Sequence, residues 1–215
     1  KVGGHPYGYT SFRVDLTPAV VYGGENVVAV RLNTEDMGSR WYPGAGIYRH
    51  VRLVKTSQVH VDHWGVFVTT PQISDKEAKA VISVKLRNHL PDPVKGHYAV
   101  SVYELDAEDR VGAEVAKCKS LPADGTLEDS VTVTVSEPRR WSLEQTNRYL
   151  ARVVVFDGKK QVDTYEVPFG FRTIRFTHDN GFLLNGKRVQ IQGTCNHHDL
   201  GALGTAVNKV ALERQ

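Results

Sequence analysis

The sequence predicts an all-β protein built around an immunoglobulin-like β-sandwich, and three observations support this prediction. Between Ser57 and Arg172, apolar and polar residues alternate in seven short runs. Turn-forming Pro, Gly and Asp residues separate those runs. After them, Asn185-Gly186 stands between two further apolar runs, which predicts a β-hairpin because both residues tolerate a positive φ.

Length and composition describe an ordinary globular chain. Its 215 residues are 40% hydrophobic and 24% charged, which suggests one or two domains. The net charge of +3 is too small and too scattered to indicate a nucleic-acid partner. No apolar run reaches the roughly 18 residues of a membrane span. The first residue is Lys1 rather than Met, so we interpret the chain as a fragment, and a missing leader says nothing about export.

The first 56 residues show β patterning and little helix. Two runs have apolar residues at every second position, and they are separated by the turn Gly23-Gly24-Glu25-Asn26. Their apolar members are Phe12, Val14 and Leu16 in the first run and Val28, Val30 and Leu32 in the second. This region is too short for a complete sandwich, so we expect it to leave apolar surface uncovered.

The central region carries the sandwich. The predicted strands are Val59–Thr70, Ala80–Asn88, His97–Leu105, Val111–Ala116, Glu128–Val135, Tyr149–Phe156 and Gln161–Val167. Seven short alternating strands over roughly 100 residues fit an immunoglobulin-like sandwich. The Cys…Trp…Cys pattern of antibody domains is absent, so the prediction concerns the architecture and not the antibody family.

The last region changes its periodicity. The hairpin is followed by Val189 and Ile191 alternating with glutamines, as in a strand. From Thr205 to Gln215 the apolar residues have helical spacing, with Thr205 as a plausible N-cap. The two cysteines, Cys118 and Cys195, lie far apart in the sequence, and we expect both to be free thiols.

A polar cluster follows Gly193: Asn196, His197, His198 and Asp199. It is open to three interpretations. A metal site is disfavoured, because adjacent residues rarely face one ion and zinc needs three or four suitably spaced ligands. The cluster could consist of structural loop residues, or it could contact a substrate at the end of a strand.

Several motifs, taken in order, resemble the family 2 glycoside hydrolases, the group of β-galactosidases, β-glucuronidases and β-mannosidases. They are Ser39-Arg40-Trp41-Tyr42-Pro43-Gly44-Ala45-Gly46-Ile47-Tyr48-Arg49, then Pro138, Trp141-Ser142 and Tyr149-Leu150, then Phe169-Gly170-Phe171-Arg172, Asn185-Gly186-Lys187 and Gly193 with Asn196-His197-His198-Asp199. The chain departs from the family pattern at Leu143 and Asn147, where prolines are frequent. Trp41 and Tyr42 could stack on sugars, but we favour a structural role in a loop.

The resemblance implies three regions. Residues 1–56 would be the C-terminal part of a jelly-roll domain, residues 57–172 the immunoglobulin-like sandwich, and residues 173–215 the first strand and helix of a (β/α)8 barrel, with Ile191-Gln192 ending that strand. Sites in such barrels form at the C-terminal ends of the strands. His197 aligns with the sugar-contacting histidine of the family, and Asn196, His198 and Asp199 are further candidate substrate-binding residues.

The resemblance also implies an activity for the full-length protein: hydrolysis of β-glycosidic bonds with retention by an exo-glycosidase, a β-galactosidase by preference. The two catalytic glutamates of the family would lie beyond Gln215, so we expect no catalytic residue in this chain and no activity from it alone. The alternative is a non-catalytic β-sandwich module for carbohydrate binding or domain spacing.

The expected partner of the full-length enzyme is a carbohydrate substrate, with no nucleic acid and no membrane. A homo-oligomer is among the expected states. We expect no cofactor and no metal site in this chain, and the sequence leaves a cation requirement of the complete enzyme open. We favour a bacterial periplasmic or secreted location over a cytoplasmic one.

Overall fold

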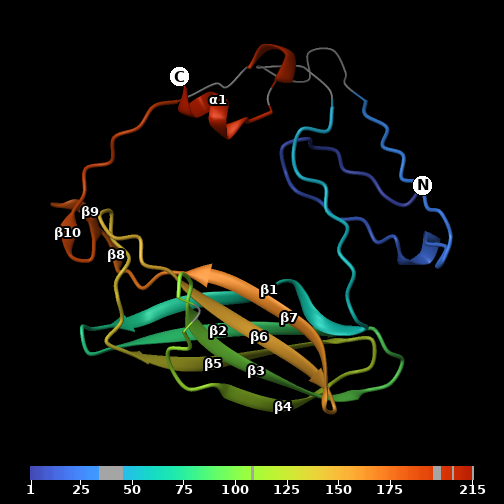
Figure 1. Ribbon diagram of the computed structural model, residues 1–215, viewed down its shortest axis with the longest axis horizontal. Helices are drawn as coiled ribbons and strands as arrows, with labels where there is room; N and C mark the ends of the chain where they lie inside the picture. Colours follow the sequence, from blue (N-terminus) through green and yellow to red (C-terminus); the bar gives the residue numbers. More distant parts are fainter. Residues whose placement is uncertain (34–45, 108, 196–199, 205, 215) are drawn as a thin grey trace. The chain divides into compact units, whose positions relative to one another are not determined.

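A computed structural model describes residues 1–33, 46–107, 109–195, 200–204 and 206–214. The chain divides into two units: residues 1–51 with 195–215, and residues 52–194 (Figure 1). No helix of the described residues has the length and apolar character needed to cross a membrane. Strands dominate the second unit, so the protein is all-β, as the sequence predicts.

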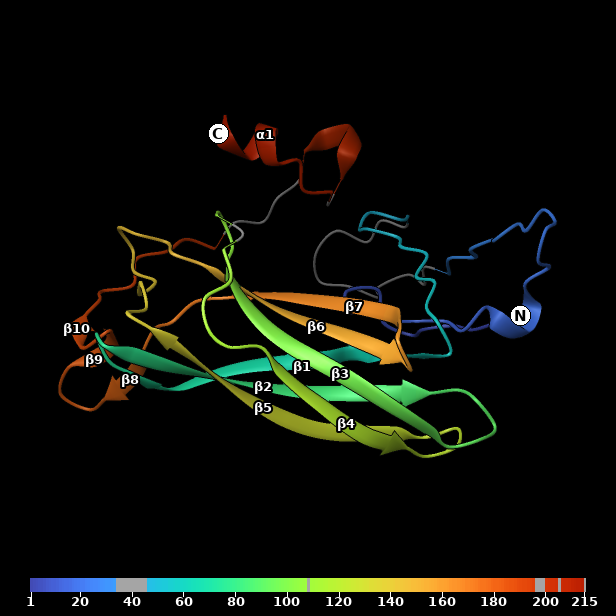
Figure 2. The same ribbon diagram turned by 60° about the horizontal axis from the view of Figure 1, so that its bottom comes forward.

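Seven antiparallel strands form two sheets in the second unit. Their bounds are β1 Val59–Ile73, β2 Glu77–Asn88, β3 Val94–Glu104, β4 Val115–Leu121, β5 Thr126–Ser136, β6 Tyr149–Asp157 and β7 Lys160–Phe169. The three-stranded sheet has the order β1-β2-β5, and the four-stranded sheet has the order β4-β3-β6-β7. Figure 2 shows the two sheets as stacked layers. This is the predicted sandwich.

The core fills the space between these sheets and follows the predicted alternation. Along β2, Ala80, Ile82, Val84 and Leu86 are buried, and their neighbours Val81, Ser83, Lys85 and Arg87 point outward. Along β5 the buried residues are Val131, Val133 and Val135. Because side chains on a strand alternate between its two faces, each of these strands offers one apolar face to the opposite sheet.

The fourth predicted strand is misplaced. It was expected at Val111–Ala116, but β4 runs from Val115 to Leu121 and pairs with β3, with Val115 opposite Val100 and Leu121 opposite Val94. The basic residues Lys117 and Lys119 hid this strand from a hydrophobicity pattern. It is an edge strand of its sheet, where charged residues are common because one side of the strand faces solvent.

A small third sheet follows β7. Its strands are β8 Ile174–Thr177, β9 Gly181–Leu184 and β10 Lys187–Arg188, in the order β10-β9-β8. Asn185 and Gly186 have φ values of 49° and 78°, which confirms the predicted hairpin with a type I′ turn. The strand stops earlier than predicted: β10 ends at Arg188, and Ile191 is exposed.

The C-terminal helix is also shorter than predicted. A 3₁₀ turn, η2, covers Gly201–Leu203, and α1 runs only from Lys209 to Glu213. Its N-cap is Asn208, whose side chain accepts a hydrogen bond from the backbone N–H of Ala211 at 3.2 Å. Thr205, the predicted cap, lies outside the described residues. Asparagine is at least as good an N-cap as threonine, so the helical spacing alone could not choose between the two residues.

The strands predicted in the first region are not found. Among the described residues of 1–51, the regular element is η1, a 3₁₀ turn at Thr17–Ala19. Phe12, Val28, Val30 and Leu32 are exposed, as expected for a region too short to build its own core. Alternation predicts an extended chain, but a strand also needs a neighbour to share its backbone hydrogen bonds, and no segment among the described residues pairs with this one.

Candidate functional site at the end of the sandwich

Three aromatic rings close the core at the end of β7. Phe171 is fully buried, and its ring centroid lies 4.8 Å from that of Tyr149 and 5.2 Å from that of Phe169, both in edge-on orientations. Aromatic rings attract one another in this geometry because the positive edge of one ring meets the negative face of the other. The chain therefore leaves the sandwich from a fixed point.

Trp141 covers the chain at this exit. Its backbone N–H donates to the carbonyl of Phe171 at 2.9 Å. Gly170 lies directly against it, since a Cβ at that position would come within 3.0 Å of the Trp141 Cβ. The guanidinium carbon of Arg172 lies 5.0 Å from the centroid of the indole ring, within cation–π range. The Phe-Gly-Phe-Arg motif thus packs on one tryptophan.

Asn185 then fixes the hairpin to this exit. Its side-chain amide donates to the carbonyl of Trp141 at 2.9 Å, and its side-chain oxygen accepts from the N–H of Thr173 at 3.0 Å. Its own N–H donates to the Thr173 carbonyl at 2.9 Å. One turn residue therefore joins the sandwich, the exit strand and the hairpin. The segment that leads to Gly193 leaves from this anchored hairpin.

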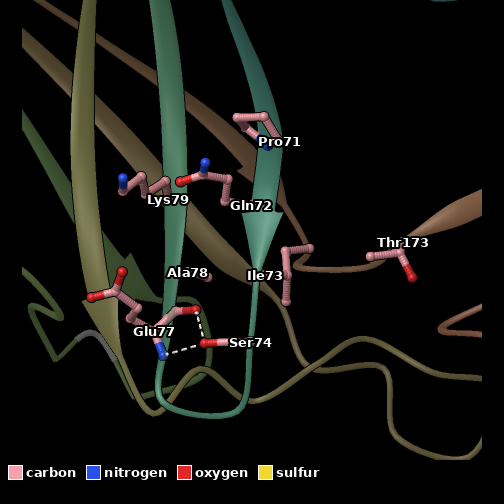
Figure 3. A pocket seen from close by; sticks show the side chains of 8 residues that line it. All are labelled: Pro71, Gln72, Ile73, Ser74, Glu77, Ala78, Lys79 and Thr173. Carbon is pink, nitrogen blue, oxygen red and sulfur yellow. Dashed lines mark hydrogen bonds between the residues drawn. The ribbon is translucent and has the colours of Figure 1, made fainter.

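A hollow of about 410 Å³ lies beside Thr173, at the ends of β1 and β2. Figure 3 shows its lining, with Gln72 and Ile73 on β1 and Glu77 and Lys79 on β2. Ser74 shapes the connecting turn: its hydroxyl donates to the Glu77 carbonyl at 2.9 Å and accepts from the Glu77 N–H at 3.0 Å (Figure 3). Among the described residues that line this hollow, Glu77 is the one carboxylate, so they do not offer the two carboxyl groups that glycoside hydrolysis uses.

The ionisable groups near the exit have structural partners. Burial raises the pKa of Tyr149, although the backbone N–H of Arg139, which donates to the phenol oxygen at 2.8 Å, opposes this shift. The carboxylate of Glu104 is paired with Arg139. The pKa of Glu144 is lowered by its own backbone N–H and by the hydroxyl of Ser142. These contacts hold the exit in place.

The adjacent carboxylates Glu128 and Asp129 on β5 also have structural partners. Oε1 of Glu128 lies 3.2 Å from Nζ of Lys85, which is opposite it on the neighbouring strand β2. Asp129 accepts a 2.8 Å hydrogen bond from the buried Tyr98. Burial acts to raise the pKa of Asp129, but the Tyr98 hydroxyl, the Ser130 N–H and the nearby lysines outweigh it and lower the pKa overall. Because neighbouring residues on a strand face opposite sides, these two carboxylates do not form a pair.

The four candidate substrate-binding residues, Asn196, His197, His198 and Asp199, lie outside the described residues, as do Trp41 and Tyr42. Cys195, just before the cluster, is an exposed free thiol, as expected. Within the part of the chain that the structure describes, no group of three or more His, Cys, Asp or Glu side chains is arranged to hold a metal.

Sequence reasoning identified Asn185 as a turn residue but missed the role of its side chain. The Asn-Gly signal concerns the backbone conformation of two residues and carries no information about a residue 44 positions earlier. It also missed the shift in register between β1 and β2 at residues 62–65. The signal was available, because a glycine that breaks the alternation of a strand indicates a bulge.

The fold and its exit define an immunoglobulin-like sandwich domain that passes the chain on through an anchored hairpin. Comparison with known proteins then gives the family. The model of "Glycosyl hydrolases family 2" matches residues 59–172, and the chain belongs to this family.

Curated relatives match the whole chain. It is 39% identical over 215 residues to "Beta-galactosidase BoGH2A" of Bacteroides ovatus, covering 100% of this chain and 25% of the relative. It is 33% identical to a "Putative beta-glucuronidase" of Formosa agariphila, covering 99% of this chain and 20% of the relative. The chain therefore spans about a quarter of the length of these relatives or less.

Solved structures agree. A family 2 glycosyl hydrolase from Bacteroides cellulosilyticus is 34% identical, with a TM-score of 0.91 over 99% of this chain and 27% of that protein. A β-glycosidase from Bacteroides vulgatus is 26% identical, with a TM-score of 0.76 over 99% of this chain and 26% of that protein. The assignment to the family rests on these matches together with the family model.

Proposed function

We propose that the full-length protein is a retaining exo-β-glycosidase, and that its substrate is a β-galactoside. The observation that carries this proposal is the 39% identity over the whole chain to a β-galactosidase. The family match over the sandwich supports the glycosidase class. Because other relatives are named β-glucuronidases, the choice of sugar rests on the similarity to the first relative.

The chemistry of retention uses two carboxyl groups about 5–5.5 Å apart, one as the nucleophile and one as the acid and base. We propose that both lie beyond Gln215, on later strands of a barrel, and that this chain alone hydrolyses no glycoside. The structural roles of Glu128 and Asp129 on β5 support this view, since one is paired with Lys85 and the other accepts from Tyr98.

The part of this chain in catalysis is proposed to be the positioning of a substrate-binding segment. His197, with Asn196, His198 and Asp199, would contact the sugar. The anchored hairpin supports this role, because Asn185 fixes the strand pair from which the segment departs. Groups that stabilise a transition state must be held precisely, and an anchored starting point for the segment favours such a role.

The proposed function includes the division into three domains that the sequence suggested. Residues 1–56 would end a jelly-roll domain, residues 57–172 form the sandwich, and residues 173–215 begin the barrel. The family match covers residues 59–172, and this supports residues 57 and 172 as the bounds of the sandwich.

The test is hydrolysis by the full-length protein of nitrophenyl β-galactoside and nitrophenyl β-glucuronide, with the 215-residue chain assayed beside it. Recognition of a glucuronide requires a cationic side chain for its carboxylate, which a galactoside does not need. We expect turnover of the galactoside by the full-length protein and none by the 215-residue chain. Preference for the glucuronide would refute the choice of sugar, and turnover by the short chain would refute the absence of the catalytic pair.

A further inference from the structure

The outward face of the β1-β2-β5 sheet carries an irregularity that displays a tryptophan. The pairing of β1 with β2 passes from Val61 opposite Leu86 to Val66 opposite Val84, so residues 62–65 have only Lys85 opposite them. This bulge pushes the extra residues out of the sheet. A Cβ on Gly65 would lie 2.6 Å from the carbonyl oxygens of Asp62 and Lys85, so only glycine fits there.

Trp64 occupies an unfavourable backbone conformation at the top of the bulge. Its φ is 51°, a region that bulky side chains rarely adopt, and its side chain is 73% exposed. The ring of His63 stacks on the indole, with centroids 4.5 Å apart and planes inclined by 24°. Strain of this kind is retained where it serves a purpose, and burial does not explain it here.

A second aromatic residue lies on the same face. Phe67 is 66% exposed, although hydrophobic residues of this size usually turn inward in a sandwich. In the sheet register it lies opposite Ser83, and Ser83 lies opposite Ser130. One row across the three strands therefore presents a phenyl ring followed by two hydroxyl groups.

These side chains surround an open hollow of about 490 Å³. The polar part of its lining consists of hydroxyl groups and of side chains with both signs of charge. The positive Nζ of Lys85 lies 3.2 Å from the negative Oε1 of Glu128, so the two form an ion pair. We call Trp64, Phe67, Ser83, Lys85, Glu128 and Ser130 the aromatic surface. It combines flat apolar rings with hydrogen-bond donors and acceptors at their edge.

We propose that the aromatic surface binds a saccharide chain. A pyranose ring has an apolar face of C–H groups, which matches the plane of an indole or phenyl ring, and a rim of hydroxyl groups. The sugar hydroxyls both donate and accept hydrogen bonds. They can therefore bind to the polar side chains of the surface, which are Ser83, Ser130, Glu128 and Lys85. A protein partner would fit less well, because interface cores are depleted of charged residues.

The inference goes beyond the proposed function, since this site would bind glycan without cleaving it. The proposed hydrolase activity enters only in the choice of probes. The test is native electrophoresis of the full-length protein in gels that contain soluble β-1,4-galactan or, separately, hydroxyethyl cellulose. Activity on nitrophenyl β-galactoside is measured on the same samples, so that a failure of the hydrolase proposal is seen independently of a failure of binding.

The informative variant is Trp64→Gly. Glycine adopts a φ of 51° without strain, so this change removes the indole and leaves the bulge intact. A matched control is Tyr22→Ala, which removes a ring on a residue that is 82% exposed and lies outside both the aromatic surface and the anchored hairpin. Phe67→Ala tests the second ring. Urea unfolding of each variant verifies that it is folded.

We expect at least one of the two polysaccharides to retard the wild-type protein. In that gel Trp64→Gly and Phe67→Ala should weaken the binding at least tenfold. Tyr22→Ala should be retarded like the wild type, and all three variants should keep the hydrolytic rate of the wild type. If neither polysaccharide retards the wild-type protein, the proposal is wrong. Such a result is expected where another part of the longer protein covers the aromatic surface. Equal retardation of wild type and Trp64→Gly would overturn it as well.

Discussion

The side-chain amide of Asn185 donates a 2.9 Å hydrogen bond to the backbone carbonyl of Trp141, 44 residues earlier in the chain. This contact joins the tight turn of the small hairpin to the loop that covers the exit of the sandwich. Because Asn185 also accepts from the N–H of Thr173, its side chain uses both of its polar atoms. The hairpin and the sandwich are therefore coupled through one residue.

Replacing Asn185 should uncouple them. Asn185→Gly keeps the positive φ of 49° and removes both side-chain hydrogen bonds, so we expect a loss of about 1–3 kcal/mol in the free energy of unfolding. Asn185→Ala should cost about 1 kcal/mol more, because alanine disfavours that φ. Urea unfolding of the 215-residue chain measures both values. Equal stability of Asn185→Gly and wild type would show that the contact contributes nothing.

The hydrogen bond from Tyr98 to Asp129 should make the free energy of unfolding depend on pH in the acidic range. The pKa of Asp129 is lowered in the folded protein, so its contribution is present above its unfolded pKa of about 3.9 and is lost as the pH falls through the folded value. Tyr98→Phe removes the donor, and we expect a loss of about 1.5–3 kcal/mol at pH 7 that shrinks at pH 2. Unfolding at both pH values measures this loss.

A double-mutant cycle isolates that interaction. Asp129→Asn alone removes the charge, and combining it with Tyr98→Phe should cost less than the sum of the two single changes. Additive effects would mean that the 2.8 Å contact is not coupled energetically.

His60 should contribute a second pH dependence, at higher pH. It is buried and stacked on His89 at 5.4 Å, and burial lowers its pKa below the usual value of about 6.5. The unfolded chain therefore binds this proton more readily, and stability falls as the pH drops below about 6.5. His60→Phe keeps an aromatic ring and removes the proton site. The difference in unfolding free energy between pH 7 and pH 5 should become smaller, and an unchanged difference would contradict the assignment.

His197→Ala tests the proposed sugar contact in the full-length protein. Loss of a transition-state contact of this kind typically costs ~10²–10³ in rate, so we expect kcat/KM on nitrophenyl β-galactoside to fall by that factor. His178→Ala is the matched control, because that side chain is fully exposed at the β8–β9 turn and should leave the rate unchanged. A His197→Ala enzyme with wild-type kinetics would remove His197 from the site.

The sequence by itself determined the features that depend on near neighbours. The alternation in β2 and β5 fixes which residues face the core, because side chains on a strand alternate regardless of what the strand pairs with. Asn185-Gly186 fixes the turn, because both residues adopt positive φ. The motifs from Ser39 to Asp199, taken in order, indicated the glycoside hydrolase family.

Tertiary structure alone decided the features that depend on distant partners. The charged strand β4 is defined by its pairing with β3. The alternating residues of the first region form no strand, because no segment in the described part of the chain pairs with them. The Asn185–Trp141 contact and the exposure of Trp64 likewise depend on which residues meet across the fold. Periodicity is a local property of the chain, whereas pairing and burial are relations between segments that the periodicity does not encode.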